Sequence, residues 1–201
     1  MSIDFMARQN NTSAKQAKVV MAAFEVVSAY GFKRTNMADI AKAAGMSRPA
    51  LYLLFANKRE IARAVVVMLK DASITNAKAA LASDAPFQER LTNAMHARTT
   101  AFLEAVEGSQ HGQELFETGM EVAGDILAGG EEEFTKLLQS NLRKAVKDGD
   151  INLKASDLSV PRLADLLIHG AYGQKTNAAS AKILRRRIND FTGAVLAGLV
   201  A

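Results

Sequence analysis

Apolar residues recur at spacings of three and four along most of the chain, and this periodicity limits the fold more than any other feature. Val20, Phe24 and Val27 show the spacing near the start, and it returns over residues 184–199. Such spacing places apolar side chains on one face of an α-helix. Only three prolines interrupt the 201 residues, and the alternation typical of strands is nearly absent. The sequence therefore predicts an all-α fold.

Glycines and capping residues divide the periodic stretches into about nine helices. Gly31 and Gly45 are placed to end helices, and Ser47 and Asn57 to begin them. The expected helices span roughly residues 14–30, 37–44, 48–56, 58–81, 86–106, 113–127, 131–147, 161–178 and 181–199. Gly129-Gly130 is expected to form a turn between two of them.

The positive charge is concentrated in the first sixty residues. Residues 1–60 hold nine Lys or Arg and four Asp or Glu, a net charge of +5, whereas residues 61–201 hold 16 and 17, a net charge of −1. This distribution favours an anionic partner such as nucleic acid. The alternative is that it reflects chance surface composition. We expect a mobile arm over residues 1–14, a basic helical unit over 15–60 and a helical body over 61–201.

Composition argues against several kinds of site. The chain has no cysteine, which excludes disulfides, thiolate metal centres and a cysteine nucleophile. Its three histidines are scattered, so we expect no metal site and no cofactor. Apolar runs fall short of the roughly 18 residues that a membrane span needs, and residues 1–11 lack the apolar region of a secretory signal. We therefore expect a soluble, cytoplasmic protein that does not bind membranes.

The most informative stretch is residues 35–58, where two short helices meet at Gly45. A turn of about three residues between two such helices has the spacing of a helix-turn-helix. Glycine fits the turn because a positive φ is costly for residues with a Cβ atom. The alternative is an ordinary helical hairpin with basic residues on its surface. The combined pattern of Gly turn, Ser-x-Pro, Leu-Tyr and Asn-Lys favours the DNA-binding motif.

The second helix of such a motif enters the major groove with its N-terminal residues. Arg48 can donate two hydrogen bonds to a guanine edge, and Ala50 can contact a thymine methyl group. Tyr52 and the start of the following helix are placed to contact phosphates. The expected DNA-binding residues are Thr35, Asn36, Ser47, Arg48, Pro49, Ala50, Tyr52 and Lys58.

With these motifs, residues 15–65 resemble the N-terminal DNA-binding domain of the TetR family of transcription regulators. The matching residues are Ala22-Ala23-Phe24, Gly31-Phe32, Thr35-Asn36-Met37, Asp39-Ile40-Ala41, Ala44-Gly45-Met46-Ser47, Leu51-Tyr52, Phe55 and Asn57-Lys58. Leu53 and Leu54 depart from the aromatic or His residues that many members carry there. The resemblance implies a homodimer, a palindromic double-stranded DNA operator with two half-sites, and a pocket for a small-molecule effector in the body.

Two helices near the end of the chain are candidates for the dimer interface that the resemblance implies. The last helix carries an apolar stripe, and the helix before it carries small residues that permit close approach. The candidates are His169, Gly170, Gly173, Leu184, Ile188, Phe191 and Val195. The alternative is that these residues pack inside one protomer.

Residues that could line the effector pocket are less specific. Methionine adapts to irregular ligands, and aromatic residues provide apolar contact area. The candidates are Met68, Met95, His96, Phe102, Phe116 and Met120, with Arg98, His111 and His169 as further polar groups. Each of these residues also suits an ordinary core or surface position.

Signatures of catalysis are lacking in the sequence. It contains neither Gly-x-Ser-x-Gly nor His-Glu-x-x-His, and Gln174 separates Gly173 from Lys175 where a phosphate-binding loop requires them adjacent. We expect no catalytic residues and no enzyme.

The function expected is a DNA-binding transcription regulator, more specifically a repressor that an effector releases from its operator. The fourth helix, which runs from the basic unit into the body, would carry the change. One alternative is a DNA-binding regulator that responds to a protein partner and to no small molecule. A second is a small helical enzyme or carrier.

Overall fold

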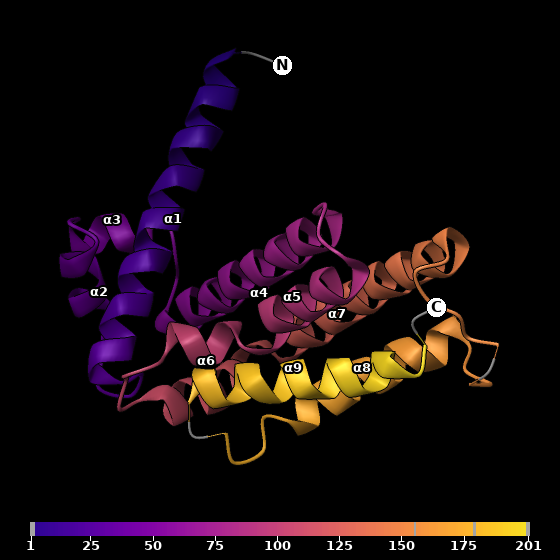
Figure 1. Cartoon of the computed structure of the whole chain (residues 1–201). Coiled ribbons are helices and arrows are strands. Elements are labelled where there is room, and N and C mark those ends of the chain that lie inside the picture. The colour runs from indigo at the N-terminus through magenta and orange to yellow at the C-terminus, as the bar shows by residue number, and fades with distance from the viewer. Residues whose placement is uncertain (1–2, 155, 179, 200–201) are drawn as a thin grey trace. The chain divides into compact units, whose positions relative to one another are not determined.

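The computed structural model describes residues 3–154, 156–178 and 180–199, and within them the all-α prediction is confirmed (Figure 1). The nine helices of these residues are α1 (Ile3–Tyr30), α2 (Met37–Ala43), α3 (Arg48–Tyr52), α4 (Lys58–Ala82), α5 (Phe87–Thr99), α6 (Ala101–Ala105), α7 (Gly112–Asp148), α8 (Val160–Gly173) and α9 (Ala181–Ala197).

The helices form two compact units. Unit 1 comprises the residues up to Leu69 together with Gly108–Leu127, and unit 2 comprises Lys70–Glu107 and the residues from Ala128 onward. The boundary that we expected at residue 60 differs from this division. α4 continues past that residue, and its first turns share an apolar core with the helices before it. Both α4 and α7 contribute to each unit.

Unit 1 is built around one apolar cluster to which four helices contribute. α2 and α3 lie beside the second half of α1 in Figure 1, and α2 packs on both. Leu51 of α3 is fully buried, and Ile40 of α2 and Ile61 of α4 are almost as inaccessible. The buried members of the cluster are Val19, Val20, Ala22, Ala23, Met37, Ile40, Ala41, Ala44, Leu51, Phe55, Ile61 and Val65.

Unit 2 has a larger core, formed by the later parts of α4 and α7 with α5, α8 and α9. Phe134, Leu138 and Leu142 lie one turn apart along α7 and are fully or almost fully buried. Leu163 and Leu167 contribute in the same way from α8. α5, α8 and α9 pack on one another in pairs. The buried residues of this core therefore recur at the helical spacing predicted from the sequence.

Two helix limits differ from the sequence prediction near the start and middle of the chain. α1 begins at Ile3, so residues 3–13, which we expected to be an arm without regular structure, are helical. The mobility of this stretch stays a prediction. The single helix expected over residues 86–106 is divided into α5 and α6 at Thr100. Thr100 and its neighbour Thr99 donate their hydroxyls to the backbone carbonyls of His96 and Met95, a pattern that competes with regular helix.

The expected turn at Gly129-Gly130 is wrong, because α7 continues through both glycines. Its interruption lies instead at Ala123, whose φ of −145° and ψ of 28° are not helical. Gly130 serves close packing: a Cβ atom there would lie 2.7 Å from Cγ of Lys70. Glycine inside a helix costs only about 1 kcal/mol relative to alanine, which packing of this kind can offset.

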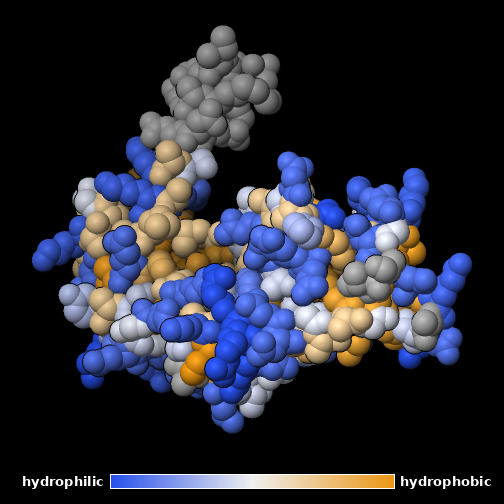
Figure 2. All heavy atoms as spheres, in the orientation of Figure 1, coloured by the Kyte–Doolittle hydropathy of each residue, from blue (hydrophilic) through white to orange (hydrophobic). Residues whose placement is uncertain are grey.

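Side chains at the surface are mostly polar where Figure 2 views them, with apolar ones between. Within the described ranges, no helix is both long and apolar enough to cross a membrane. The described residues also bring together no group of three or more His, Asp or Glu side chains that could hold a metal ion.

Candidate nucleic-acid interface

The link between α1 and α2 is held by its own backbone and by a buried threonine. Gly31 ends α1 with a φ of +85°, and its N–H donates to the Val27 carbonyl at 2.9 Å. Thr35 is buried, and its hydroxyl donates to the Gly31 carbonyl at 2.8 Å. We expected Thr35 to contact phosphate. That prediction is wrong for the hydroxyl in this conformation, since it lies inside the protein.

Asn36 begins α2 as its N-cap. Its Oδ1 accepts hydrogen bonds from the N–H groups of Ala38 at 2.8 Å and Asp39 at 3.1 Å. The Asp39 carboxylate in turn accepts from the Asn36 N–H at 2.8 Å, which completes a capping box. The side-chain oxygen of Asn36 is therefore used to fix the start of α2, and a phosphate contact from this residue stays a prediction.

The turn between α2 and α3 has the geometry that the sequence predicts. Gly45 has a φ of +63°, a region that favours glycine. Its N–H donates to the Lys42 carbonyl at 3.1 Å, and the Met46 N–H donates to the Ala41 carbonyl at 3.0 Å. These two bonds form a Schellman motif. They fix the direction in which the chain leaves α2, and hence where α3 begins.

α3 is short and is held at both ends. Ser47 caps it, accepting a hydrogen bond from the Ala50 N–H at 3.3 Å. Pro49 lies in the first turn, where the missing N–H leaves no intrahelical bond unmade. Leu51 is fully buried in the core of unit 1. The cap and this anchor fix the rotation of the helix about its axis.

That rotation turns a continuous set of side chains outward. Arg48 and Pro49 are exposed, and Ala50 is half-buried. Tyr52 is 44% exposed, with its ring centroid 5.7 Å from Cζ of Arg48. Leu53, directly after α3, is 87% exposed, and we had not included it among the site residues. Its departure from the family pattern was the signal that singled it out. An exposed arginine beside an exposed aromatic ring suits a nucleic-acid surface.

Lys58 has a structural role that the sequence did not reveal. Its Nζ donates to the carbonyls of Phe32 at 2.6 Å and Thr35 at 2.7 Å, and lies 4.2 Å from the centroid of the Phe32 ring. Burial lowers the pKa of this ammonium, and the Glu114 carboxylate partly opposes that effect. We expected Lys58 to contact phosphate. Two of its three N–H donors instead hold the α1–α2 link against the start of α4.

Replacing Lys58 with methionine is therefore expected to lower the free energy of unfolding by about 1–2 kcal/mol, because two partly buried carbonyls lose their donor. Urea unfolding followed by circular dichroism measures the change. Lys42→Met is the matched control, since Lys42 is an exposed lysine of α2 in the same unit. Equal stabilities of the two variants would contradict this role for Lys58.

Residues 108–127, far away in the sequence, brace the same link. The Glu114 carboxylate accepts from the Lys33 N–H at 2.8 Å and lies 3.6 Å from Nδ1 of His111. Ser109 donates its hydroxyl to the Ser28 carbonyl at 2.6 Å. His111, considered above as a ligand-orienting group, thus lies beside the α1–α2 link. Local sequence patterns gave no sign of these contacts, because their partners are 81 residues apart.

A further brace joins α4 to the kink of α7. Arg63 donates to both carboxylate oxygens of Asp125, at 2.8 and 2.7 Å, and to the Val122 carbonyl at 2.6 Å. The non-helical Ala123 lies between these two acceptors. Hydrogen bonding and charge from Arg63, with the N–H groups of Asp125 and Ile126, lower the pKa of the Asp125 carboxyl to about 2.

This pKa predicts how the contact responds to acid. Because the pKa of Asp125 is lowered in the folded protein from its ordinary value of 3.8, its contribution to stability is complete above about pH 4 and is lost as pH falls through 2. Carbon-13 NMR titration of Asp125 is expected to give a pKa of about 2 in the native chain and a higher pKa, closer to the ordinary 3.8, in Arg63→Gln. An unchanged value in the variant would show that Arg63 is not the cause.

The residues predicted to line a pocket are not brought together within one unit. Met68, Phe116 and Met120 lie in unit 1, whereas Met95, His96 and Phe102 lie in unit 2. Met95 is buried core, as the alternative interpretation has it. His96 is also buried, which lowers its pKa, and its Nε2 is 2.8 Å from Oδ1 of Asn189.

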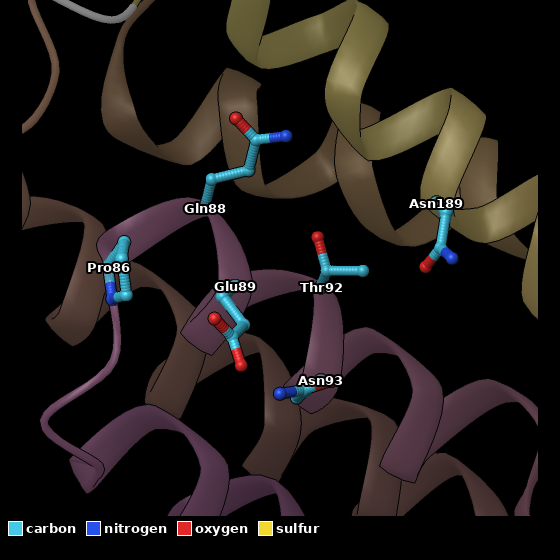
Figure 3. A pocket seen from close by; sticks show the side chains of 6 residues that line it. All are labelled: Pro86, Gln88, Glu89, Thr92, Asn93 and Asn189. Carbon is cyan, nitrogen blue, oxygen red and sulfur yellow. The ribbon is translucent and has the colours of Figure 1, made fainter.

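Unit 2 has a polar hollow of about 480 Å³ that the sequence did not predict (Figure 3). Its side chains come from Pro86, the first turns of α5 and one position of α9. The lining residues are Pro86, Gln88, Glu89, Thr92, Asn93 and Asn189. None of the six predicted pocket residues lines this hollow.

Several predicted dimer residues are core residues of one protomer. Leu184 and Ile188 are buried in unit 2, so their assignment to an interface is wrong. Gly170 packs against the tip of the Phe191 ring, since a Cβ atom there would lie 2.2 Å from Cζ of that ring. The remaining candidates are His169 and Gly173, which are exposed, and Val195, which is partly buried against the core. His169 lies 3.2 Å from the carboxylate of Asp165.

The capped α2, the glycine turn and the outward face of α3 define a helix-turn-helix protein. Residues 19–65 match the family model described as bacterial regulatory proteins, tetR family. This part of the chain is therefore similar to the DNA-binding domain of TetR-family transcription regulators.

Known proteins resemble the chain in sequence over part of its length and in fold over most of it. An uncharacterised HTH-type transcriptional regulator of Bacillus subtilis, YvdT, is 33% identical over 76 residues, which are 38% of this chain and 39% of that protein. The chain thus matches about two fifths of the length of this curated relative.

Two solved structures share the fold. A TetR/AcrR family regulator from Thermobifida fusca has a TM-score of 0.66 at 20% identity, covering 89% of this chain and 96% of its own. SmeT, solved in complex with triclosan, has a TM-score of 0.65 at 19% identity, covering 94% and 92%.

Proposed function

We propose that this chain is a sequence-specific DNA-binding regulator in which α3 enters the major groove. The outward face of α3 is the observation that carries this proposal. The cap and the buried anchor hold α3 in place within the protein, so its outward side chains are available to contact DNA. Arg48 at the first position of the helix is placed to donate two hydrogen bonds to guanine, and Ala50 to contact a thymine methyl group. Exposed Tyr52 is placed for a phosphate. Exposed Lys33 and Arg34 add basic charge from the α1–α2 link.

We infer that the regulator acts as a homodimer on a palindromic operator. Two recognition helices about 34 Å apart would fit successive major grooves on one side of the duplex. The exposed sides of α8 and α9 are the proposed interface. They present Leu166, which is 43% exposed, near His169 and Gly173. Sedimentation of Leu166→Glu against the native chain tests this surface, and an unchanged mass would place the interface elsewhere.

We further propose that the regulator is a repressor which a small-molecule effector releases. Support comes from SmeT, whose structure holds triclosan, and from the course of α4 and α7, each of which belongs to both units. A ligand shifts such an equilibrium only by its difference in affinity for the two forms. An effector that left operator affinity unchanged would contradict this mechanism.

The decisive experiment is selection of binding sites from a random duplex pool at near-physiological salt. A palindromic motif is the expected result, and the spacing of its halves would give the dimer geometry. The same selection with Leu51→Ala protein is the control for enrichment that does not depend on a folded α3. No enrichment over that control would contradict sequence-specific binding.

A further inference from the structure

Arg98 of α5 is an arginine whose hydrogen bonding is incomplete. Its Nε is buried and has no hydrogen-bond partner among the described residues. No described carboxylate lies within ion-pair distance of its guanidinium. A buried N–H without an acceptor costs roughly 1–3 kcal/mol, and more when the group is charged. This cost is removed when an acceptor binds.

Lys175 provides a second cation close to the first. It follows the end of α8, and its Nζ lies 4.7 Å from the centroid of the Tyr172 ring. Although the residue as a whole is exposed, loss of hydration at the ammonium and the positive charge of Arg98 together lower the pKa of Lys175 to about 8. The positive charge of Arg98 therefore acts on the Lys175 ammonium, and both residues belong to unit 2.

The groups around this pair leave it positively charged. Glu131 of α7 is near enough to raise the pKa of Lys175, but it forms no described ion pair with either cation. Lys70 of α4 and Arg98 both approach Gly130, and the Lys70 ammonium is already paired with Asp71 at 2.7 Å. Arg187 of α9 donates to the carbonyls of Gln174 and Thr176 on either side of Lys175. The segment that presents Lys175 is therefore fixed.

We propose that Arg98 and Lys175 together bind the anionic head group, a carboxylate or a phosphate, of a small organic ligand in unit 2. The arginine fork supplies parallel N–H donors to two oxygens of one anion, and the lysine supplies a point charge. The ring of Tyr172 positions the ammonium. This inference rests on the proposed function, since the anion is the effector of the proposed regulator.

Because the proposed ligand is an anion, its affinity should depend on pH, whereas the affinity of a neutral ligand should not. A bound anion favours the charged form of Lys175, whose pKa is about 8 without ligand. Affinity for the anion is therefore highest below pH 8 and falls by up to about tenfold per pH unit above it, until the pKa of the complex is reached.

The test uses four probes with one tail and different heads: octanoate, octyl phosphate, 1-octanol and octylamine. Calorimetric titration of the full chain at pH 7 and pH 9.5 measures their affinities without DNA. Octanoate or octyl phosphate is expected to bind at least tenfold more tightly than the other two, with the advantage reduced at pH 9.5. The comparison of these two anions distinguishes a carboxylate effector from a phosphate effector.

Variants connect the binding to the two residues. Arg98→Gln and Lys175→Met are each expected to weaken binding of the anion at least tenfold. Arg143→Gln, which removes an exposed arginine of α7 in the same unit, is the control and should leave binding unchanged. If Arg98→Gln does not fold, as judged by circular dichroism, Arg98→Lys and the pH dependence of the native chain decide.

Octanol binding as tightly as octanoate, no binding of either anion at millimolar concentration, or equal behaviour of Arg98→Gln and the control would overturn the proposal. Because these titrations contain no DNA, they fail independently of the proposed function. Anion binding without selection of an operator would contradict only the DNA-binding proposal. Operator selection without anion binding would contradict only the anion site.

Discussion

Leu51→Ala is expected to lower the free energy of unfolding by about 2–5 kcal/mol, the range for removing a leucine from a well-packed core. Leu51 has no exposed surface and joins α3 to the cluster that α1, α2 and α4 share. The neighbouring apolar side chains cannot fill the cavity that this substitution leaves unless α3 itself moves. Urea unfolding of the full chain measures the change, and the loss should appear in the transition that reports on unit 1.

The sequence offers a matched control two residues away. Leu53→Ala removes the same atoms from a side chain that is 87% exposed, so we expect a change within about 0.5 kcal/mol. Similar losses for the two variants would mean that α3 is rotated differently about its axis. The outward face proposed for DNA would then be wrong as well.

Arg48→Ala is expected to weaken binding to the selected operator by about 1–3 kcal/mol, or roughly 5- to 150-fold, and to relax specificity at one base pair. The reason is that a bidentate contact to guanine reports the identity of a base, whereas a phosphate contact does not. Fluorescence anisotropy with the operator and its single-base variants measures both effects.

Two further substitutions separate charge from recognition. Arg48→Lys keeps the charge but loses the fork, so it should also relax specificity. Arg34→Ala removes an exposed cation from the α1–α2 link. It should weaken binding to all DNA sequences equally and reduce the slope of log affinity against log salt concentration by about one. If Arg48→Ala behaved like Arg34→Ala, Arg48 would be a phosphate contact and not a base contact.

Local signals were sufficient to predict the helix-turn-helix. Asn36, Gly45 and Ser47 act through hydrogen bonds to residues two to four positions away, so their roles can be read from spacing alone. Lys58 was placed correctly at the start of a helix, but its acceptors are 23 and 26 residues distant. Sequence spacing contains no information about such partners.

The kink of α7 and the apolar stripe of α9 show two further limits of prediction from sequence. The break lies at Ala123, where Arg63 of another helix contacts the backbone, and not at the two glycines that locally weaken the helix. For Leu184 and Ile188, burial within a protomer and burial against a second copy require the same apolar spacing. Periodicity identified the buried face of α9 but not what covers it.

The inward-facing and outward-facing positions of α3 differ in how much stability a substitution costs. Folding depends on the Ser47 cap and on Leu51, whereas Arg48, Pro49, Tyr52 and Leu53 face outward within and just after a helix of five residues. Substitutions at these outward positions cost little stability, since they remove no buried contact. A duplicated copy of such a gene can therefore acquire a new target sequence by a few point mutations while its scaffold stays intact.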